Sequence, residues 1–186
     1  TWDHACHIQA QMFAETAALG GLEIQLCYYR GIGEFKASSW LTDTTSLQRK
    51  MTAVRCLGGH TQIGRVLEHA TAMAKQHRTD ALVFVGDCME EDIDELCQLA
   101  GVLGIHGVPA FMFHEGGDMR AGQGFRQIAN LTKGAYCPFD AGSASQLRDL
   151  LSAVAVYAAG GRLALERFGQ RRGETVRRLT RQIDKG

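Results

Sequence analysis

The feature that most constrains the fold is the apolar run ALVFVG at residues 81–86, which Asp87 follows directly. Its length and β-branched content favour a strand buried on both faces of a parallel sheet. The runs VPAFMF at 108–113 and AYCPF at 135–139 repeat the pattern. Segments with helical spacing of apolar residues separate them, so residues 61–159 alternate between helix and strand. This alternation predicts an α/β fold, a doubly wound and mostly parallel sheet with helices on both faces.

The first part of the chain predicts a helix and then a hairpin. Apolar residues recur with helical spacing over residues 3–19. The segment LEIQLCYY at 22–29 alternates in polarity, and EFKASSW at 34–40 follows it after the turn RGIG. We therefore expect one antiparallel hairpin at the edge of the sheet.

The charge pattern predicts one body with a basic tail. Lys plus Arg is 20 and Asp plus Glu is 20, so the net charge is zero, which argues against a general nucleic-acid binder. Residues 162–186 nevertheless carry eight basic and three acidic side chains. Gly160 and Gly161 mark the one candidate boundary. We predict a domain over residues 1–160 and a basic helical extension over 161–186. Because no apolar run approaches about 18 residues, we expect no membrane span.

The six cysteines point away from a disulfide framework or a zinc site. They are scattered through the chain, several of them lie in apolar runs, and no C-x-x-C pair occurs. Free cysteine often packs as a small apolar residue. The sequence therefore predicts a reducing, cytoplasmic compartment.

Three loops are expected at the carboxyl ends of the parallel strands, where open α/β sheets bind ligands. They are CLGGHT at 56–61, GDCMEED at 86–92 and HEGGD at 114–118. Their hydroxyl and carboxylate oxygens suit a hard cation such as Mg²⁺ or Mn²⁺. For Thr61 and Asp87 a plain capping role at a helix start is an open alternative.

The acids of the second loop have a simpler interpretation. Glu90, Glu91 and Asp92 stand just before a predicted helix. Carboxylates stabilise the positive end of a helix, so we expect these three to serve the helix that follows them.

Two segments carry a family resemblance. GGHTQIGRVLEHA at 58–70 resembles the glycine-glycine-threonine segment that opens a helix in von Willebrand factor type A domains. ALVFVGDCMEED at 81–92 resembles the apolar strand of that family, which ends in an aspartate. With the order of the elements, the resemblance covers about residues 1–160 and is closest to small stand-alone bacterial members. It implies a Rossmann-like fold.

The resemblance also implies a metal-ion-dependent adhesion site. Its cation, usually Mg²⁺, is held by an Asp-x-Ser-x-Ser loop, a threonine and an aspartate, and Thr61 and Asp87 match the last two. No Asp-x-Ser/Thr-x-Ser precedes the first helix here, so we expect the central strand and its loop to be missing from this sequence. The slot between the strands at 22–29 and 81–86 should then be empty, and the cation weakly held or absent.

The function implied is a binding module that captures an acidic residue of a partner protein without breaking a bond. Neither nucleic acid nor membrane is an expected partner, and the oligomeric state stays open. The alternative is an enzyme of the cysteine-hydrolase type, with Cys88 as nucleophile and His60 or His114 as base. Because acids surround Cys88 and should raise its pKa, the sequence favours the binding module.

Overall fold

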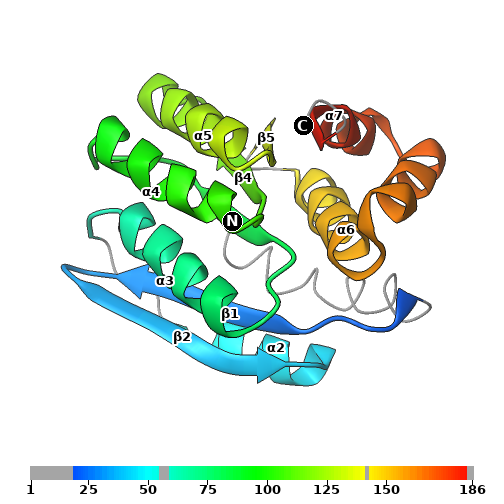
Figure 1. The fold of residues 1–186 in the computed structure, drawn as a ribbon, viewed down its shortest axis with the longest axis horizontal. Helices are drawn as coiled ribbons and strands as arrows, with labels where there is room; N and C mark the ends of the chain where they lie inside the picture. Colours follow the sequence, from blue (N-terminus) through cyan, green and yellow to red (C-terminus); the bar gives the residue numbers. More distant parts are fainter. Residues whose placement is uncertain (1–18, 55–58, 141–142, 184–186) are drawn as a thin grey trace.

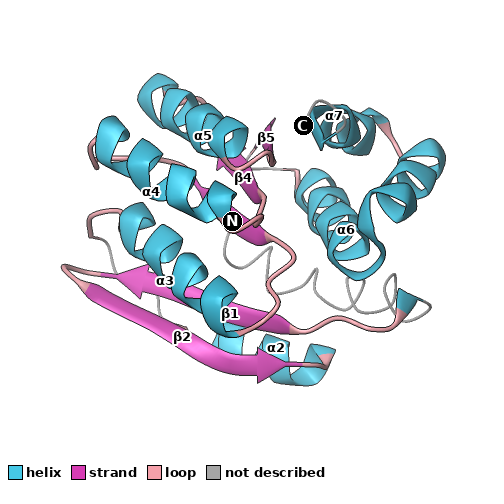
Figure 2. Cartoon of the chain, in the orientation of Figure 1, coloured by secondary structure: helices cyan, strands magenta, loops and turns pink. Residues whose placement is uncertain are grey.

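The computed structural model describes residues 19–54, 59–140 and 143–183 of the chain (Figures 1 and 2). The helix predicted from residue 3 lies outside these ranges up to residue 18. In chain order the described elements are β1 (Ile24–Arg30), β2 (Glu34–Leu41), α2 (Thr44–Thr52), α3 (Ile63–Gln76), β3 (Leu82–Gly86), α4 (Ile93–Ile105), β4 (Ala110–Glu115), α5 (Met119–Leu131), β5 (Ala135–Phe139), α6 (Ala144–Arg171) and α7 (Glu174–Ile183).

The strands form two separate sheets. β3, β4 and β5 make a parallel sheet in that order, with Phe84 opposite Met112 and Phe113 opposite Cys137. β1 and β2 make an antiparallel hairpin. The predicted α/β class, the parallel sheet and the antiparallel hairpin are therefore confirmed.

The central strand β4 is buried on both faces, as its apolar run predicts. Phe111 and Phe113 belong to one core cluster with α6 and α7, and Met112 belongs to a second cluster with α3, α4 and α5. Alternation of side chains along a strand produces this division. Helices consequently cover both faces of the sheet, with α3, α4 and α5 side by side on one of them (Figure 1).

The hairpin and the parallel sheet are not joined by a ladder. In the described part of the chain, β1 pairs with β2 alone and β3 pairs with β4 alone, so the hairpin is a separate sheet and not an edge of the parallel one. Helix α3 holds the hairpin instead. His69 Nε2 and Gln25 Oε1 are hydrogen-bonded at 2.8 Å, and Arg65 Nη1 donates to the Gly33 carbonyl at 2.6 Å.

The C-terminal segment is helical, as predicted, and the helical backbone breaks at the expected boundary. α6 continues to Arg171 through a break at Gly161, whose φ of 70° suits glycine. Leu165, Val176 and Leu179 are fully buried in the same cluster as Phe111. The basic segment thus contributes core side chains to the body.

None of the helices in the described ranges is both long and apolar enough to cross a membrane.

Candidate functional site

The loop after β3 folds back onto the first turn of α3. The Glu91 carboxylate accepts hydrogen bonds from the backbone N–H groups of Ile63 at 2.7 Å and Gly64 at 2.8 Å. Gln62 stands at the N-cap position, but its side chain makes no capping bond. Glu91 therefore satisfies N–H groups that a helix start leaves unpaired, and it places negative charge at the positive end of α3.

Glu90 binds Thr61 in the same way. The backbone N–H and the hydroxyl of Thr61 both donate to Glu90 Oε2, at 2.9 and 2.7 Å. In return, the Glu90 N–H donates to Thr61 Oγ1 at 3.2 Å. The hydrogen bond from the Thr61 side chain is the largest cause that lowers the pKa of Glu90 below its ordinary value. Thr61 is thus a partner of the β3 loop and not the cap of α3.

These contacts correct the prediction for the three acids of this loop. Only Asp92 serves the helix that follows, where it caps α4 by accepting from Asp94 N–H at 2.9 Å and Glu95 N–H at 3.1 Å. Glu90 and Glu91 serve the segment that leads into α3 instead. The reason is spatial, because the first turn of α3 lies within reach of their carboxylates.

Cys88 follows Asp87 on the same loop and lies near both Asp87 and Glu90. Burial, then hydrogen bonds to Asp87 and Glu90 and the charges of both, raise the pKa of the Cys88 thiol to about 12. Asp87 therefore lies on the same loop as Glu90, the hydrogen-bond partner of Thr61. We call Thr61, Asp87, Cys88, Glu90 and Glu91 the β3-loop cluster.

Tyr29, near the end of β1, lies close to the β3-loop cluster. Burial is the largest cause that raises the pKa of the Tyr29 phenol, and electrostatic interaction with Glu91, Cys88, Asp87 and Glu90 raises it further. Sequence reasoning missed this residue, because the alternating strand pattern gives no sign of which loop a tyrosine will meet.

The cluster offers the oxygen donors that suit a hard cation, but few of them. Thr61 supplies a hydroxyl oxygen and Asp87 a carboxylate. Within residues 19–54, 59–140 and 143–183, no group of three or more His, Cys, Asp or Glu side chains is placed to hold a metal ion. The type of donor fits Mg²⁺ or Mn²⁺, whereas two donors would leave most of an octahedral shell to water.

The two candidate base histidines lie in different surroundings. β4 extends through His114 and Glu115, which were predicted to be in a loop. His114 is 2% exposed. Its ring shares a hydrogen bond of 2.9 Å with the Tyr136 hydroxyl and packs edge-on against Phe125. His60 is exposed and interacts electrostatically with Glu90. Neither histidine is hydrogen-bonded to Cys88 in the described structure.

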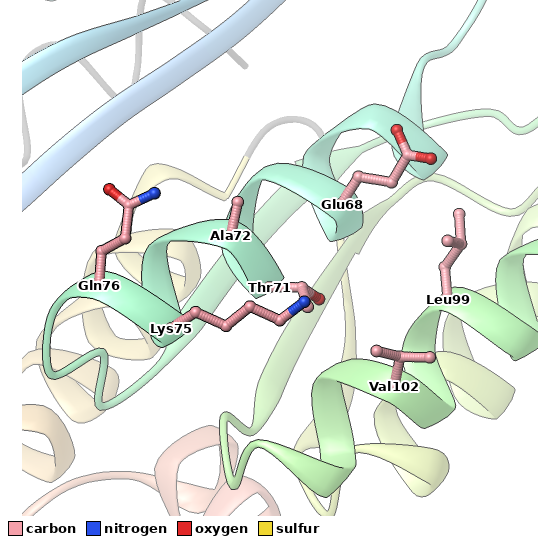
Figure 3. A pocket seen from close by; sticks show the side chains of 7 residues that line it. All are labelled: Glu68, Thr71, Ala72, Lys75, Gln76, Leu99 and Val102. Atoms are coloured by element: carbon pink, nitrogen blue, oxygen red, sulfur yellow. The ribbon is translucent and has the colours of Figure 1, made fainter.

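A shallow groove between α3 and α4 lies apart from the predicted residues. Glu68 and Lys75 contribute charged side chains to it, and Leu99 and Val102 contribute apolar ones (Figure 3). None of the β3-loop cluster lines this groove.

No protein-family model matches the chain, and no curated protein matches it in sequence. The resemblance to von Willebrand factor type A domains therefore rests on the two sequence motifs and the order of the elements.

Proposed function

We propose that this chain is a protein-binding module that uses a divalent cation, Mg²⁺ or Mn²⁺, to recognise an acidic side chain of a partner protein. The observation that supports it best is the hydrogen bonding of Thr61 to Glu90, which lies on the same loop after β3 as Asp87. It brings the two candidate ligands into one cluster after β3, at the edge where open α/β sheets bind ligands. Neither nucleic acid nor a membrane surface is part of the proposal.

In this proposal, residues of the chain bind the cation and the cation binds the partner. The Thr61 hydroxyl and the Asp87 carboxylate would hold the cation, which supplies a positive charge with an exchangeable position for a partner's carboxylate. Asp87 and Glu90 both raise the pKa of Cys88 through their negative charge. A cation would relieve the mutual repulsion of such carboxylates.

Binding is a better proposal than hydrolysis by Cys88. A nucleophilic cysteine needs thiolate character, which a neighbouring positive charge or imidazole supplies. Here burial and two carboxylates favour the neutral thiol. His114, one of the two candidate bases, faces Tyr136 and Phe125 in the core.

The test is thermal unfolding of the 186-residue chain in millimolar Mg²⁺ or Mn²⁺. A cation that binds the native state raises the melting temperature by mass action. We expect a small rise in the parent, none in Asp87→Ala and a reduced one in Thr61→Ala. Asp94→Ala, which removes an exposed carboxylate from the first turn of α4, should keep the rise of the parent. A parent without any rise, or an Asp87→Ala variant that keeps it, would contradict the proposal.

Recognition of an acidic side chain on the partner needs a separate binding experiment. We expect a short peptide with one central glutamate to bind in Mg²⁺ and not in EDTA, and the glutamine version of that peptide not to bind in either. Equal binding of the two peptides would argue against recognition of an acidic group even if the cation binds.

We also propose a reducing, cytoplasmic compartment. Cys27, Cys88, Cys97 and Cys137 are free thiols, as expected where disulfides do not persist.

A further inference from the structure

We infer that Gln182 of α7 acts as a substitute strand residue that closes the outer edge of β5, and that it thereby prevents a second copy of this chain from pairing at that edge. The two residues that carry the inference are Gln182 and Pro138. Both act on backbone groups that β5 turns away from its neighbour β4.

β5 is the last strand of the parallel sheet. In a parallel ladder, successive residues turn their N–H and C=O groups to opposite sides. The Phe139 carbonyl accepts from Gly116 N–H, which follows β4, at 3.2 Å and so points inward. Tyr136 and Pro138 therefore present their backbone groups to the outer side.

The Gln182 side chain meets Tyr136 at this outer side. Its Oε1 accepts from the Tyr136 N–H at 2.9 Å, and its Nε2 donates to the Tyr136 carbonyl at 3.0 Å. One acceptor and one donor on a planar amide reproduce what the backbone of an adjacent strand would offer. Nε2 also donates to the Arg178 carbonyl at 3.2 Å, which fixes the side chain against its own helix.

Pro138 completes the closure. It is the next outward-facing residue of β5 and has no N–H, so it cannot donate to an added strand. With Tyr136 satisfied, β5 itself presents no free outward N–H.

The position of α7 is set by its apolar face. Val176, Leu179 and Ile183 are buried in the same core cluster as Cys137 of β5. α7 therefore lies beside β5 at the end of the sheet (Figure 1). The helix thus carries Gln182 to the edge and holds it there.

The consequence concerns self-association. An open strand edge is a template for pairing with another chain. Without Gln182, Tyr136 could exchange both of its outward hydrogen bonds with Tyr136 of a second, antiparallel copy.

The experiment compares the full chain with Gln182→Ala. We expect the Tyr136 amide to exchange its hydrogen faster by about tenfold, as for the loss of one hydrogen bond. We also expect light scattering to show a mass that rises with concentration more steeply than in the parent. Arg181→Ala, on the exposed side of the same helix, is the matched control and should change neither quantity.

Two results would overturn the inference. One is Tyr136 exchange in Gln182→Ala at the parent rate, and the other is faster exchange without added association. If Gln182→Ala does not fold cooperatively, Gln182→Met is used, because its side chain has a similar length but offers the Tyr136 N–H no strong acceptor and the Tyr136 carbonyl no donor. The same two readouts then decide.

Discussion

Glu91 Oε1 accepts a hydrogen bond from the Gly64 N–H at 2.8 Å and so joins the loop after β3 to the first turn of α3. A Cβ at position 64 would lie 3.3 Å from Glu91 Oε1 and equally close to Leu99. Glycine therefore leaves room both for the carboxylate and for the packing of α4 on α3. This contact is one of the hydrogen bonds that hold the loop of the candidate site against α3.

We expect Glu91→Ala to lower the free energy of unfolding by about 1–2 kcal/mol, the usual cost of losing a helix cap. Glu91→Gln keeps an acceptor oxygen and should cost less. Urea unfolding measures both. Glu68→Ala, an exposed carboxylate on the same helix, should stay within about 0.5 kcal/mol of the parent. Equal losses in Glu91→Ala and Glu68→Ala would show that the capping contact is not stabilising.

Glu90 should make stability depend on pH in the acid range. Its pKa is lowered in the folded chain, chiefly by the hydrogen bond from Thr61. The contact therefore stabilises the fold above the pKa of an unfolded glutamate, about 4.3. This stabilisation is lost as the pH falls through the lower, folded pKa.

Urea midpoints of the parent and of Glu90→Gln measure this effect. The difference between them should be largest near pH 6 and should shrink toward pH 3. Thr61→Val removes the hydroxyl and should weaken the pH dependence in the same range. Parallel curves for parent and Glu90→Gln would contradict the assignment.

Cys88 should react slowly with iodoacetamide. With a pKa of about 12, its thiolate fraction at pH 8 is on the order of 10⁻⁴. Removing a negative neighbour in Asp87→Asn or Glu90→Gln should lower that pKa and speed the reaction. Mass spectrometry of the peptide that contains Cys88 follows the labelling, and Cys88→Ser confirms its assignment. Fast, selective labelling at neutral pH would instead favour the cysteine enzyme.

α7 should be required for a stable body. Leu179 is fully buried, so Leu179→Ala should cost about 2–5 kcal/mol. Leu163 lies on α6 with 67% of its surface exposed, and Leu163→Ala should cost far less. Deleting residues 174–186 should lower the melting temperature more than Leu179→Ala does. A deleted chain that unfolds with the parent's stability would show that α7 is dispensable.

Local patterns were sufficient for most of the strands and several helix starts. The apolar run at 81–86 predicted β3, which forms at Leu82–Gly86, because a strand between two layers of helices needs apolar side chains on both faces. Asp92 precedes the helix it caps by one residue, so its role is local. The end of β4 was missed because His114 interrupts the apolar pattern, although Tyr136 and Phe125 bury it.

Tertiary packing decided the contacts of the candidate site. Glu90 reaches Thr61 across 29 residues of sequence, and no periodicity shows which helix start a carboxylate will meet. The sequence predicted a basic helical extension over residues 161–186, but composition gave no sign of what its apolar side chains would contact. Only the fold places Leu179 in the core and Gln182 against Tyr136. The spacing of apolar residues indicates which side chains will be buried. The residues that they contact depend on how the helices and sheets pack against one another.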